Sequence, residues 1–339
     1  MAHTRISANL PPNVDPTKAA LAFGKRALTK LNEELGSPEL LTQQRALMAL
    51  CDLVHNPENI YQAIEIGFLV NLKNLLLHHD STVRQKTTQI LSIMALHNAG
   101  REELIQKGVI SAVTELLDDP VDICRKNTHQ ILAMMAKFPE GAVDILHNHL
   151  VPLLILKLKT EPDEIQELIL DTLSNCLRVE ASEALSTGAI TILKEKLTHA
   201  SAVIRSKAAW VLLEIGTHPE GKTAALEEVI PVLVSLLEDT DPEVQASATG
   251  ALMFATVKPQ GRFLALGAEA IPPLLKLVAA ETRKARLSAI KTLTMLAELP
   301  EGRKMLLDHT DTFQQCLNDP CEAVQRAAKI AISVIRWKP

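Results

Sequence analysis

One stretch of the chain carries residues with a recognised catalytic spacing. Residues 216–223 match the pattern G-x-x-x-x-G-K-[ST] through Gly216, Gly221, Lys222 and Thr223. This is the phosphate-binding loop pattern of ATP- and GTP-hydrolysing proteins, in which backbone N–H groups surround the phosphates. Such a loop must follow a strand and begin a helix. The neighbouring elements therefore decide whether the chain is an NTPase.

The stretch is one copy of a repeated unit. The positions equivalent to Gly221 follow one another at intervals of 40 or 41 residues: Gly100, Gly141, Ala181, Gly221, Gly261 and Gly302. A second marker is an acid or Ser followed by Pro, which we assign to a single place in the unit: Ser37-Pro38, Asp119-Pro120, Glu161-Pro162, Asp241-Pro242 and Asp319-Pro320. A fixed period of this length is typical of repeat proteins.

The residues between the markers indicate helices. Asp241 is expected to accept hydrogen bonds from the free N–H groups of a helix start, and Pro242 suits the first turn because it lacks an N–H. Apolar residues then recur at helical spacing. Each unit is predicted to contain a short first helix, a second helix and a longer third helix. Since one unit cannot bury its own apolar face, neighbouring units must stack.

The sequence therefore predicts an all-α fold, an α-solenoid with about seven to eight units of 40 residues. We assign the solenoid to residues 27–339. The preceding residues 1–26 contain the run PPNVDP and are predicted to form an extended N-terminal arm.

The repeat register argues against a nucleotide site. It places residues 208–215 at the end of a third helix, where a phosphate loop requires a strand. Pro219 removes one donor N–H, and Glu220 would bring a carboxylate next to the phosphates. Lys222 occupies the position of a recurring basic residue, which is Arg101, Arg262 or Arg303 in other units. We predict that the match is coincidental and that the protein is not an enzyme.

Composition gives little support to other kinds of chemistry. The net charge of −5 is spread along the chain, which gives no reason to expect a nucleic acid or a membrane as partner. The five cysteines are scattered and are interpreted as reduced thiols. The pairs His78-His79 and His147/His149 come without a second ligand pair. We expect no metal, no cofactor and no small-molecule substrate.

The unit resembles the armadillo repeat, with HEAT repeats as a close alternative. This resemblance implies a right-handed α-solenoid of armadillo (ARM/HEAT-like) repeats. At a finer level, the chain resembles the radial spoke head 14 homologue family, also called rhabdoid tumour deletion region proteins. The resemblance is carried by segments 15–35, 44–58, 204–209 and 291–307 and by the terminal VIRWKP. It implies a structural scaffold in the radial spoke of motile cilia and sperm flagella. It also implies other spoke proteins as partners, and a location in the cytoplasm, on the cytoskeleton of the axoneme.

The alternative is a soluble armadillo adaptor or peptide-transport receptor outside the axoneme. Nuclear-import receptors of this fold carry a Trp and, four residues later, an Asn on successive third helices. Here the Trp position holds Met48, Gln89, His129, Asp171, Trp210, Gly250, Lys291 and Ile330. The Asn position holds Asp52, Ile93, Ala133, Asn175, Glu214, Phe254, Met295 and Val334. The incomplete ladders disfavour an import receptor.

From these positions we select candidate partner-binding residues on the inner surface of the solenoid: Gln89, His129, Asp171, Asn175, Trp210 and Glu214. Trp210 has two interpretations, as a packing residue between repeats or as an aromatic contact for a peptide. The polar residues are equally compatible with a solvated helix face. Arg84, Arg205 and Arg286 recur near third-helix starts, and we expect them to bond carbonyls or acids of neighbouring loops.

Overall fold

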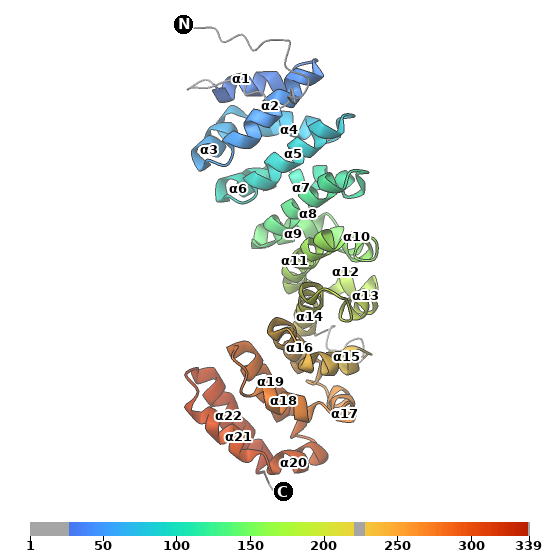
Figure 1. Ribbon diagram of the computed structural model, residues 1–339, viewed down its shortest axis with the longest axis vertical. Coiled ribbons are helices and arrows are strands. Elements are labelled where there is room, and N and C mark those ends of the chain that lie inside the picture. Colours follow the sequence, from blue (N-terminus) through green and yellow to red (C-terminus); the bar gives the residue numbers. More distant parts are fainter. Residues whose placement is uncertain (1–26, 220–227, 338–339) are drawn as a thin grey trace. The chain divides into compact units, whose positions relative to one another are not determined.

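The computed structural model describes residues 27–219 and 228–337, and within these ranges it contains helices and turns but no strand (Figure 1). The predicted all-α solenoid of armadillo/HEAT-type repeats is confirmed. The predicted arm of residues 1–26 lies outside the described residues, so the division of the chain into an arm and one solenoid stays a prediction.

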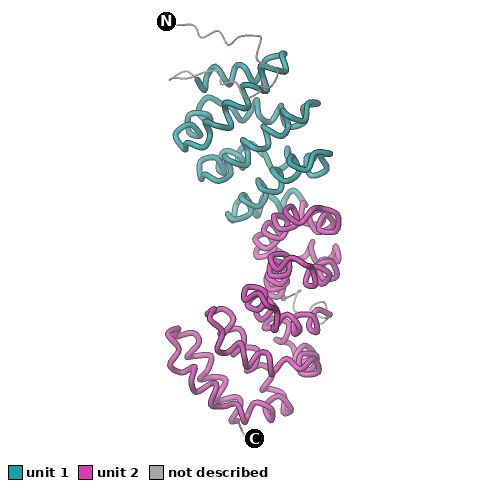
Figure 2. The backbone as a smooth tube through the Cα atoms, viewed as in Figure 1, with its two compact units in different colours: residues 1–148 teal, residues 149–339 magenta. Residues whose placement is uncertain are grey.

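The chain forms two compact units, unit 1 with residues 1–148 and unit 2 with residues 149–339 (Figure 2). In each unit, consecutive repeats stack through their third helices. Those of unit 1 are α2 (Leu40–Leu53), α5 (Ser81–Met94) and α8 (Asp122–Ala136). Those of unit 2 are α11 (Asp163–Val179), α14 (Ala202–Thr217), α16 (Pro242–Ala255), α19 (Arg283–Leu296) and α22 (Glu322–Ile335).

Shorter helices pack beside each third helix. The described first helices are α3 (Pro57–Ile66), α6 (Asn98–Gln106), α9 (Pro139–His147), α12 (Ser182–Ser186), α17 (Pro259–Gly267) and α20 (Pro300–Leu307). The second helices are α1 (Ala27–Leu35), α4 (Phe68–Leu75), α7 (Val109–Val113), α10 (Leu150–Lys157), α13 (Ala189–Lys196), α15 (Ile230–Ser235), α18 (Ile271–Leu277) and α21 (Thr310–Gln315). Short 3₁₀ helices of three to five residues extend α7, α15 and α21: Thr114–Asp118, Leu236–Glu238 and Cys316–Asn318.

A residue in the left-handed conformation joins a first helix to a second helix in several repeats. Gly67, Gly108 and Gly188 have φ values of 82°, 61° and 78°. His149 takes this place before α10, with φ 53°. Glycine is favoured here because a side chain is strained at positive φ.

The recurring glycine near the start of four described first helices has a steric cause. A Cβ atom on Gly100, Gly141 or Gly302 would lie 2.1, 2.2 or 2.2 Å from a backbone oxygen at the end of the preceding third helix. At Gly261 the corresponding distance is 1.9 Å. Only glycine therefore allows the first helix to pack directly against the end of the third helix.

The Asp-Pro markers divide into two structural classes. Asp241 is the N-cap of α16 and accepts hydrogen bonds from the N–H groups of Glu243 and Val244, as predicted. Asp119 and Asp319 instead lie two residues before the N-cap residues Val121 and Cys321. The expectation that all these pairs share one place in the unit is therefore wrong.

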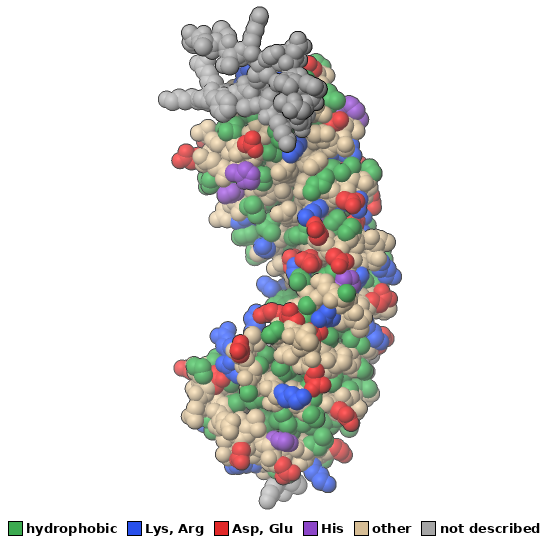
Figure 3. All heavy atoms as spheres, viewed as in Figure 1, with side chains coloured by type: hydrophobic (Ala, Val, Ile, Leu, Met, Phe, Trp, Pro, Cys, Tyr) green, Lys and Arg blue, Asp and Glu red, His purple; other side chains and the backbone are tan. Residues whose placement is uncertain are grey.

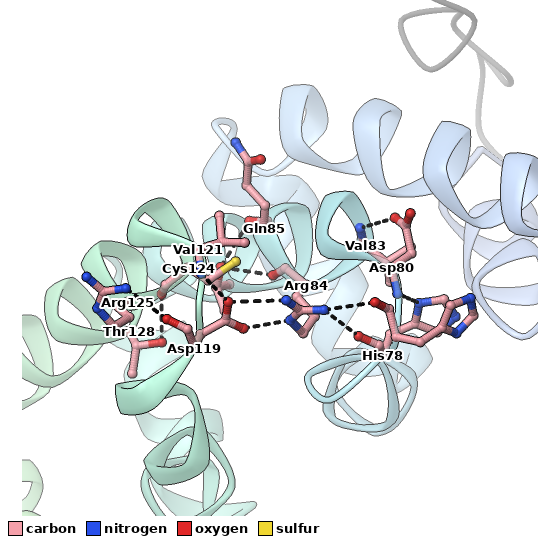
Figure 4. A network of polar contacts seen from close by, with 12 residues as sticks. His78, Asp80, Val83, Arg84, Gln85, Asp119, Val121, Cys124, Arg125 and Thr128 are labelled. Atoms are coloured by element: carbon pink, nitrogen blue, oxygen red, sulfur yellow. Dashed lines mark hydrogen bonds and ion pairs between the residues drawn. The ribbon is translucent and has the colours of Figure 1, made fainter.

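Asp119 bonds an arginine of the preceding repeat. Arg84 Nε and Nη2 donate to the Asp119 carboxylate over 2.6 and 3.2 Å, and Arg84 Nη1 donates to the carbonyls of His78 and His79 (Figure 4). The Asp119 carboxylate also accepts the N–H of Val121 at 2.8 Å. Both side chains of the pair are largely buried.

The same arrangement occurs twice in unit 2. Arg205 pairs with Asp239 through two bonds of 2.9 Å, and Arg286 pairs with Asp319 through bonds of 2.8 and 3.2 Å. Each arginine also donates to two carbonyls of its own repeat. The structural role expected for these arginines is confirmed, and we call the three pairs the arginine–aspartate locks.

Candidate functional site

The segment before the phosphate-loop pattern is a helix. Helix α14 continues to Thr217, and Gly216 is a buried residue within it. A strand, which a phosphate loop requires at this place, is therefore absent from residues 202–217. The remaining pattern residues Gly221, Lys222 and Thr223 lie outside the described residues.

The arginines at the position of Lys222 in other repeats have a clear structural role. Arg101 Nη1 donates to the carbonyl of Ala95 over 2.9 Å, at the end of α5. Arg262 and Arg303 donate through Nε to the carbonyls of Thr256 and Ala297, over 3.0 and 3.1 Å. A basic side chain here satisfies free carbonyls at the end of the preceding third helix. The fold thus accounts for a basic residue at this position without a ligand.

In unit 1 the two candidate partner-binding residues differ in exposure. Gln89 on α5 is half-buried, and its Oε1 accepts a hydrogen bond of 3.1 Å from Lys86 Nζ. His129 on α8 is 0% exposed. The expectation that His129 lines the inner surface is therefore corrected, because its side chain packs inside the unit.

In unit 2, Asp171 and Trp210 lie together in a polar pocket of about 270 Å³. Asp171 Oδ2 accepts a bond of 2.8 Å from Lys207 Nζ, which also donates to the carbonyl of Glu167. Lys284 Nζ of α19 lies 4.6 Å from the centre of the half-buried Trp210 ring, a cation–π contact. Trp210 therefore packs between repeats, as one interpretation predicted, and it also reaches the surface, while a contact with a peptide stays a prediction.

Asn175 and Glu214 make contacts near this pocket but do not line it. Asn175 Nδ2 donates to the carbonyl of Asp171 over 2.9 Å. Glu214 is 5% exposed, and its Oε1 meets Arg178 Nη2 at 3.1 Å. Glu214 thus presents little surface of its own, while the Arg178 side chain is 59% exposed. Whether any of the selected residues binds a partner stays a prediction.

Farther along the same unit, α16, α19 and α22 form an apolar groove of about 480 Å³. Its walls include Met253, Phe254, Leu287, Met295 and Ile330. Ile330 is 58% exposed, so the groove is open to solvent. An exposed apolar concavity of this kind is typical of sites that bind other molecules.

The selection from sequence missed this groove, although the repeat register had located several of its residues. Lys291 and Ile330 occupy the Trp position, and Phe254 and Met295 occupy the Asn position. The selection favoured Trp210 and polar side chains at these positions, so it did not include the apolar residues among them. Reading these positions for apolar character would have found the groove.

The histidine pair and the other candidate metal ligands of the described residues do not gather into a metal site. Within residues 27–219 and 228–337, no cluster of three His, Cys, Asp or Glu side chains is arranged to hold a metal ion. His78 and His79 stack with ring centres 4.1 Å apart, and the carbonyls of both accept bonds from Arg84. None of the helices in these ranges has the length and apolar character needed to cross a membrane.

Comparisons with known proteins agree with this architecture. The family model for HEAT repeats matches residues 190–294. An engineered protein of known crystal structure is similar over 91% of this chain and 78% of its own, with a TM-score of 0.84 and 24% identity. A designed armadillo repeat protein in complex with the peptide (KR)4 is similar over 67% of this chain and 99% of its own, with a TM-score of 0.62 and 25% identity. A computationally designed armadillo protein for modular peptide recognition has a TM-score of 0.64 and 24% identity over 67% of this chain and 99% of its own.

Fold and surface together define an armadillo/HEAT-type repeat protein, a class suited to holding other proteins. In unit 2 the third helices contribute to two hollows of the surface. They are the polar pocket around Trp210 and the apolar groove of α16, α19 and α22.

Proposed function

We propose that the protein is a non-catalytic scaffold that holds other proteins through the third-helix surface of unit 2. The observation that carries this proposal is the open apolar groove of α16, α19 and α22. Two apolar residues of the groove, Ile330 and Val257, are 58% and 38% exposed to solvent. A partner that covers them removes apolar surface from water, which favours association.

The repeat architecture supports a scaffold in a second way. A stack of helical repeats offers equivalent side-chain positions at regular intervals, so contacts can be distributed along a partner. On the faces visible in Figure 3, acidic, basic and apolar side chains are interspersed within each unit. Such a mixed surface is favourable for protein partners and unfavourable for the phosphate backbone of a nucleic acid.

We further propose that the scaffold acts in the radial spoke of motile cilia and sperm flagella, with other spoke proteins as partners. The support is the sequence resemblance, which extends from residue 15 to VIRWKP at the C-terminus. The matching segments 44–58 and 291–307 cover parts of third helices and the first helices that follow them. They therefore include structural residues of the repeat as well as exposed ones.

Localisation in ciliated cells tests the spoke proposal. A tagged copy of the full chain is expressed, the membrane is removed with detergent, and the protein remaining on the axoneme is measured. Retention on the axoneme, and its loss when the spokes are absent, is the expected result. A protein that washes out with the detergent, or that accumulates in the nucleus, contradicts it.

A soluble peptide adaptor is the second candidate, because a designed armadillo protein of similar fold binds the basic peptide (KR)4. Binding of that peptide to the purified chain would favour this candidate. The charged residues of the apolar groove are basic, however, and a basic peptide would meet charge of its own sign.

A further inference from the structure

The apolar groove of unit 2 has walls from three consecutive repeats. Phe254 and Met253 come from α16, Leu287 and Met295 from α19, and Ile330 from α22. Phe254 and Met295 are half-buried, so each rests on the core and keeps an exposed edge. Flexible methionine side chains beside an aromatic ring can adapt to the shape of an inserted apolar group.

The charged residues that line the groove are both basic. They are Lys291 on α19 and Arg326 on α22. Lys291 is exposed, and no hydrogen bond or ion pair joins its ammonium group to another residue of the described ranges 27–219 and 228–337. Arg326 Nη2 meets Glu322 Oε2 at 2.8 Å, with both side chains more than three-quarters exposed. An exposed pair of this kind contributes little, so Arg326 remains able to bind another carboxylate.

Helix α19 continues this pattern toward the polar pocket. Lys284, Leu287 and Lys291 are spaced three and four residues apart, so they follow one face of the helix. Two exposed lysines thus flank an apolar residue of the groove wall. The chemistry that complements this face is an apolar side chain with a carboxylate on either side.

We propose that the apolar groove binds a segment of a partner protein in which large apolar side chains are flanked by Asp or Glu. The apolar side chains insert between Phe254, Met295 and Ile330, and the carboxylates contact Lys291, Arg326 and Lys284. The proposal rests on the scaffold function proposed above and specifies the partner that this surface selects. Burial of the apolar anchors supplies the affinity, and the lysines exclude basic segments.

Two other occupants of the groove are a segment of the chain itself and a second copy of the chain, and charge argues against the first. Residues 1–26 of the chain include Arg5, Lys18, Lys25 and Arg26 but a single acid, Asp15, so that segment has the wrong charge. A second copy of the chain would have to place its own exposed apolar surface in the groove. Sedimentation of the purified chain, described below, distinguishes such a homodimer from binding of another protein.

A random peptide library displayed on phage is selected against the immobilised full-length chain. We expect the recovered peptides to combine Leu, Phe, Ile or Met with an excess of Asp and Glu. One recovered peptide is then synthesised with a fluorescent label, together with a version in which every acid is replaced by Lys, and both are compared with (KR)4. Binding of the acidic peptide alone supports the proposal, and preferential binding of either basic peptide overturns it.

Two substitutions in the groove are each paired with a control in the same unit. Lys291→Glu is expected to weaken binding of the acidic peptide about tenfold, whereas Lys304→Glu on α20 leaves it unchanged. Ile330→Ser is expected to weaken it by a similar factor, whereas Leu307→Ser, at a residue 48% exposed and outside the groove, does not. All four residues are exposed, so loss of folding is not expected to complicate the comparison.

Equal effects of the groove and control substitutions would overturn the proposal, as would a library that yields no acidic-apolar enrichment. Sedimentation of the purified chain provides the remaining comparison. A dimer that Ile330→Ser dissociates would identify a second copy as the occupant and overturn the partner proposed here. These results do not depend on axonemal retention, so failure of the groove proposal is distinguishable from failure of the spoke proposal.

Discussion

Arg205 of one repeat and Asp239 of the next form a two-bonded ion pair, with Nε and Nη2 each 2.9 Å from a carboxylate oxygen. The side chains are 16% and 8% exposed, so the pair is largely removed from water. Because Arg205 also donates to the carbonyls of the adjacent residues His199 and Ala200, a single guanidinium joins one loop of its own repeat with the next repeat.

Removal of one partner of this lock should destabilise the stack. Arg205→Ala leaves the Asp239 carboxylate buried without its charge partner, and we expect a loss of about 2 kcal/mol. The matched control is Lys276→Ala, which removes an ion pair to Glu238 whose side chains are 72% and 59% exposed, and which should cost less than about 1 kcal/mol. Urea unfolding followed by Trp210 fluorescence in a Trp337→Phe background measures both. Equal midpoints for the two variants would contradict the prediction.

The locks should also make stability depend on acid pH. Burial raises the pKa of Asp239, but hydrogen bonds from Arg205 and from the N–H of Asp241 outweigh it, so the pKa lies below its ordinary value. Because the pKa of Asp239 is lower in the folded state, its ionised carboxylate stabilises the fold fully above the unfolded-state pKa of about 3.9. This contribution is lost as the pH falls below that value, through the folded-state pKa. Urea midpoints from pH 7 down to pH 3 should fall, with a smaller fall in Asp239→Asn. If the urea midpoint of Asp239→Asn falls with pH as steeply as that of the unaltered chain, the lock is not the cause of the acid dependence.

The recurring glycines give a steric prediction with an internal control. In Gly302→Ala the new Cβ would lie 2.2 Å from the carbonyl oxygen of Leu296, so the first helix must shift, at a cost of about 2 kcal/mol. Gly267→Ala places its Cβ in open space and should be neutral or stabilising by about 0.5 kcal/mol. Thermal unfolding of both variants distinguishes them. A tolerated Gly302→Ala would show that the close approach of the helices is not required.

Nucleotide binding provides the remaining prediction. Since the segment before Gly216 is the helix α14, we expect no binding of ATP or GTP at micromolar concentration by isothermal titration calorimetry. Lys222→Ala should give the same heat as the unaltered chain. Micromolar binding that this substitution abolishes would refute the prediction.

The sequence predicted the repeat well because its markers are local. A period of 40 residues, helix caps and apolar spacing all follow from residues close in the chain, and the third helices lie where they were expected. The arginine locks were also foreseeable, since a basic residue recurred at one position. Asp119 and Asp241 were nevertheless assigned to one place in the unit. The sequence Asp-Pro is identical in the two cases, although Asp241 caps a helix and Asp119 bonds an arginine of the preceding repeat.

The surface was harder to predict, for a physical reason. Successive residues of a helix are about 100° apart, so a small rotation of the helix decides between core and solvent. His129 and Asp171 share a repeat position, yet His129 is buried and Asp171 is partly exposed. The apolar groove further required the packing of three repeats to be known. A polar side chain was therefore an unreliable indicator of a contact surface.

The close packing of glycine against the end of a third helix has a consequence for pattern searches across genomes. The fold favours Gly followed by a basic residue at this junction, as in Gly261-Arg262 and Gly302-Arg303. A chance match to the nucleotide-binding pattern requires three further conditions: the basic residue is Lys, the next residue is Thr, and the preceding helix ends with a glycine. Repeat proteins of this class should therefore yield occasional false NTPase matches at this junction, and a check for the 40-residue period would remove them.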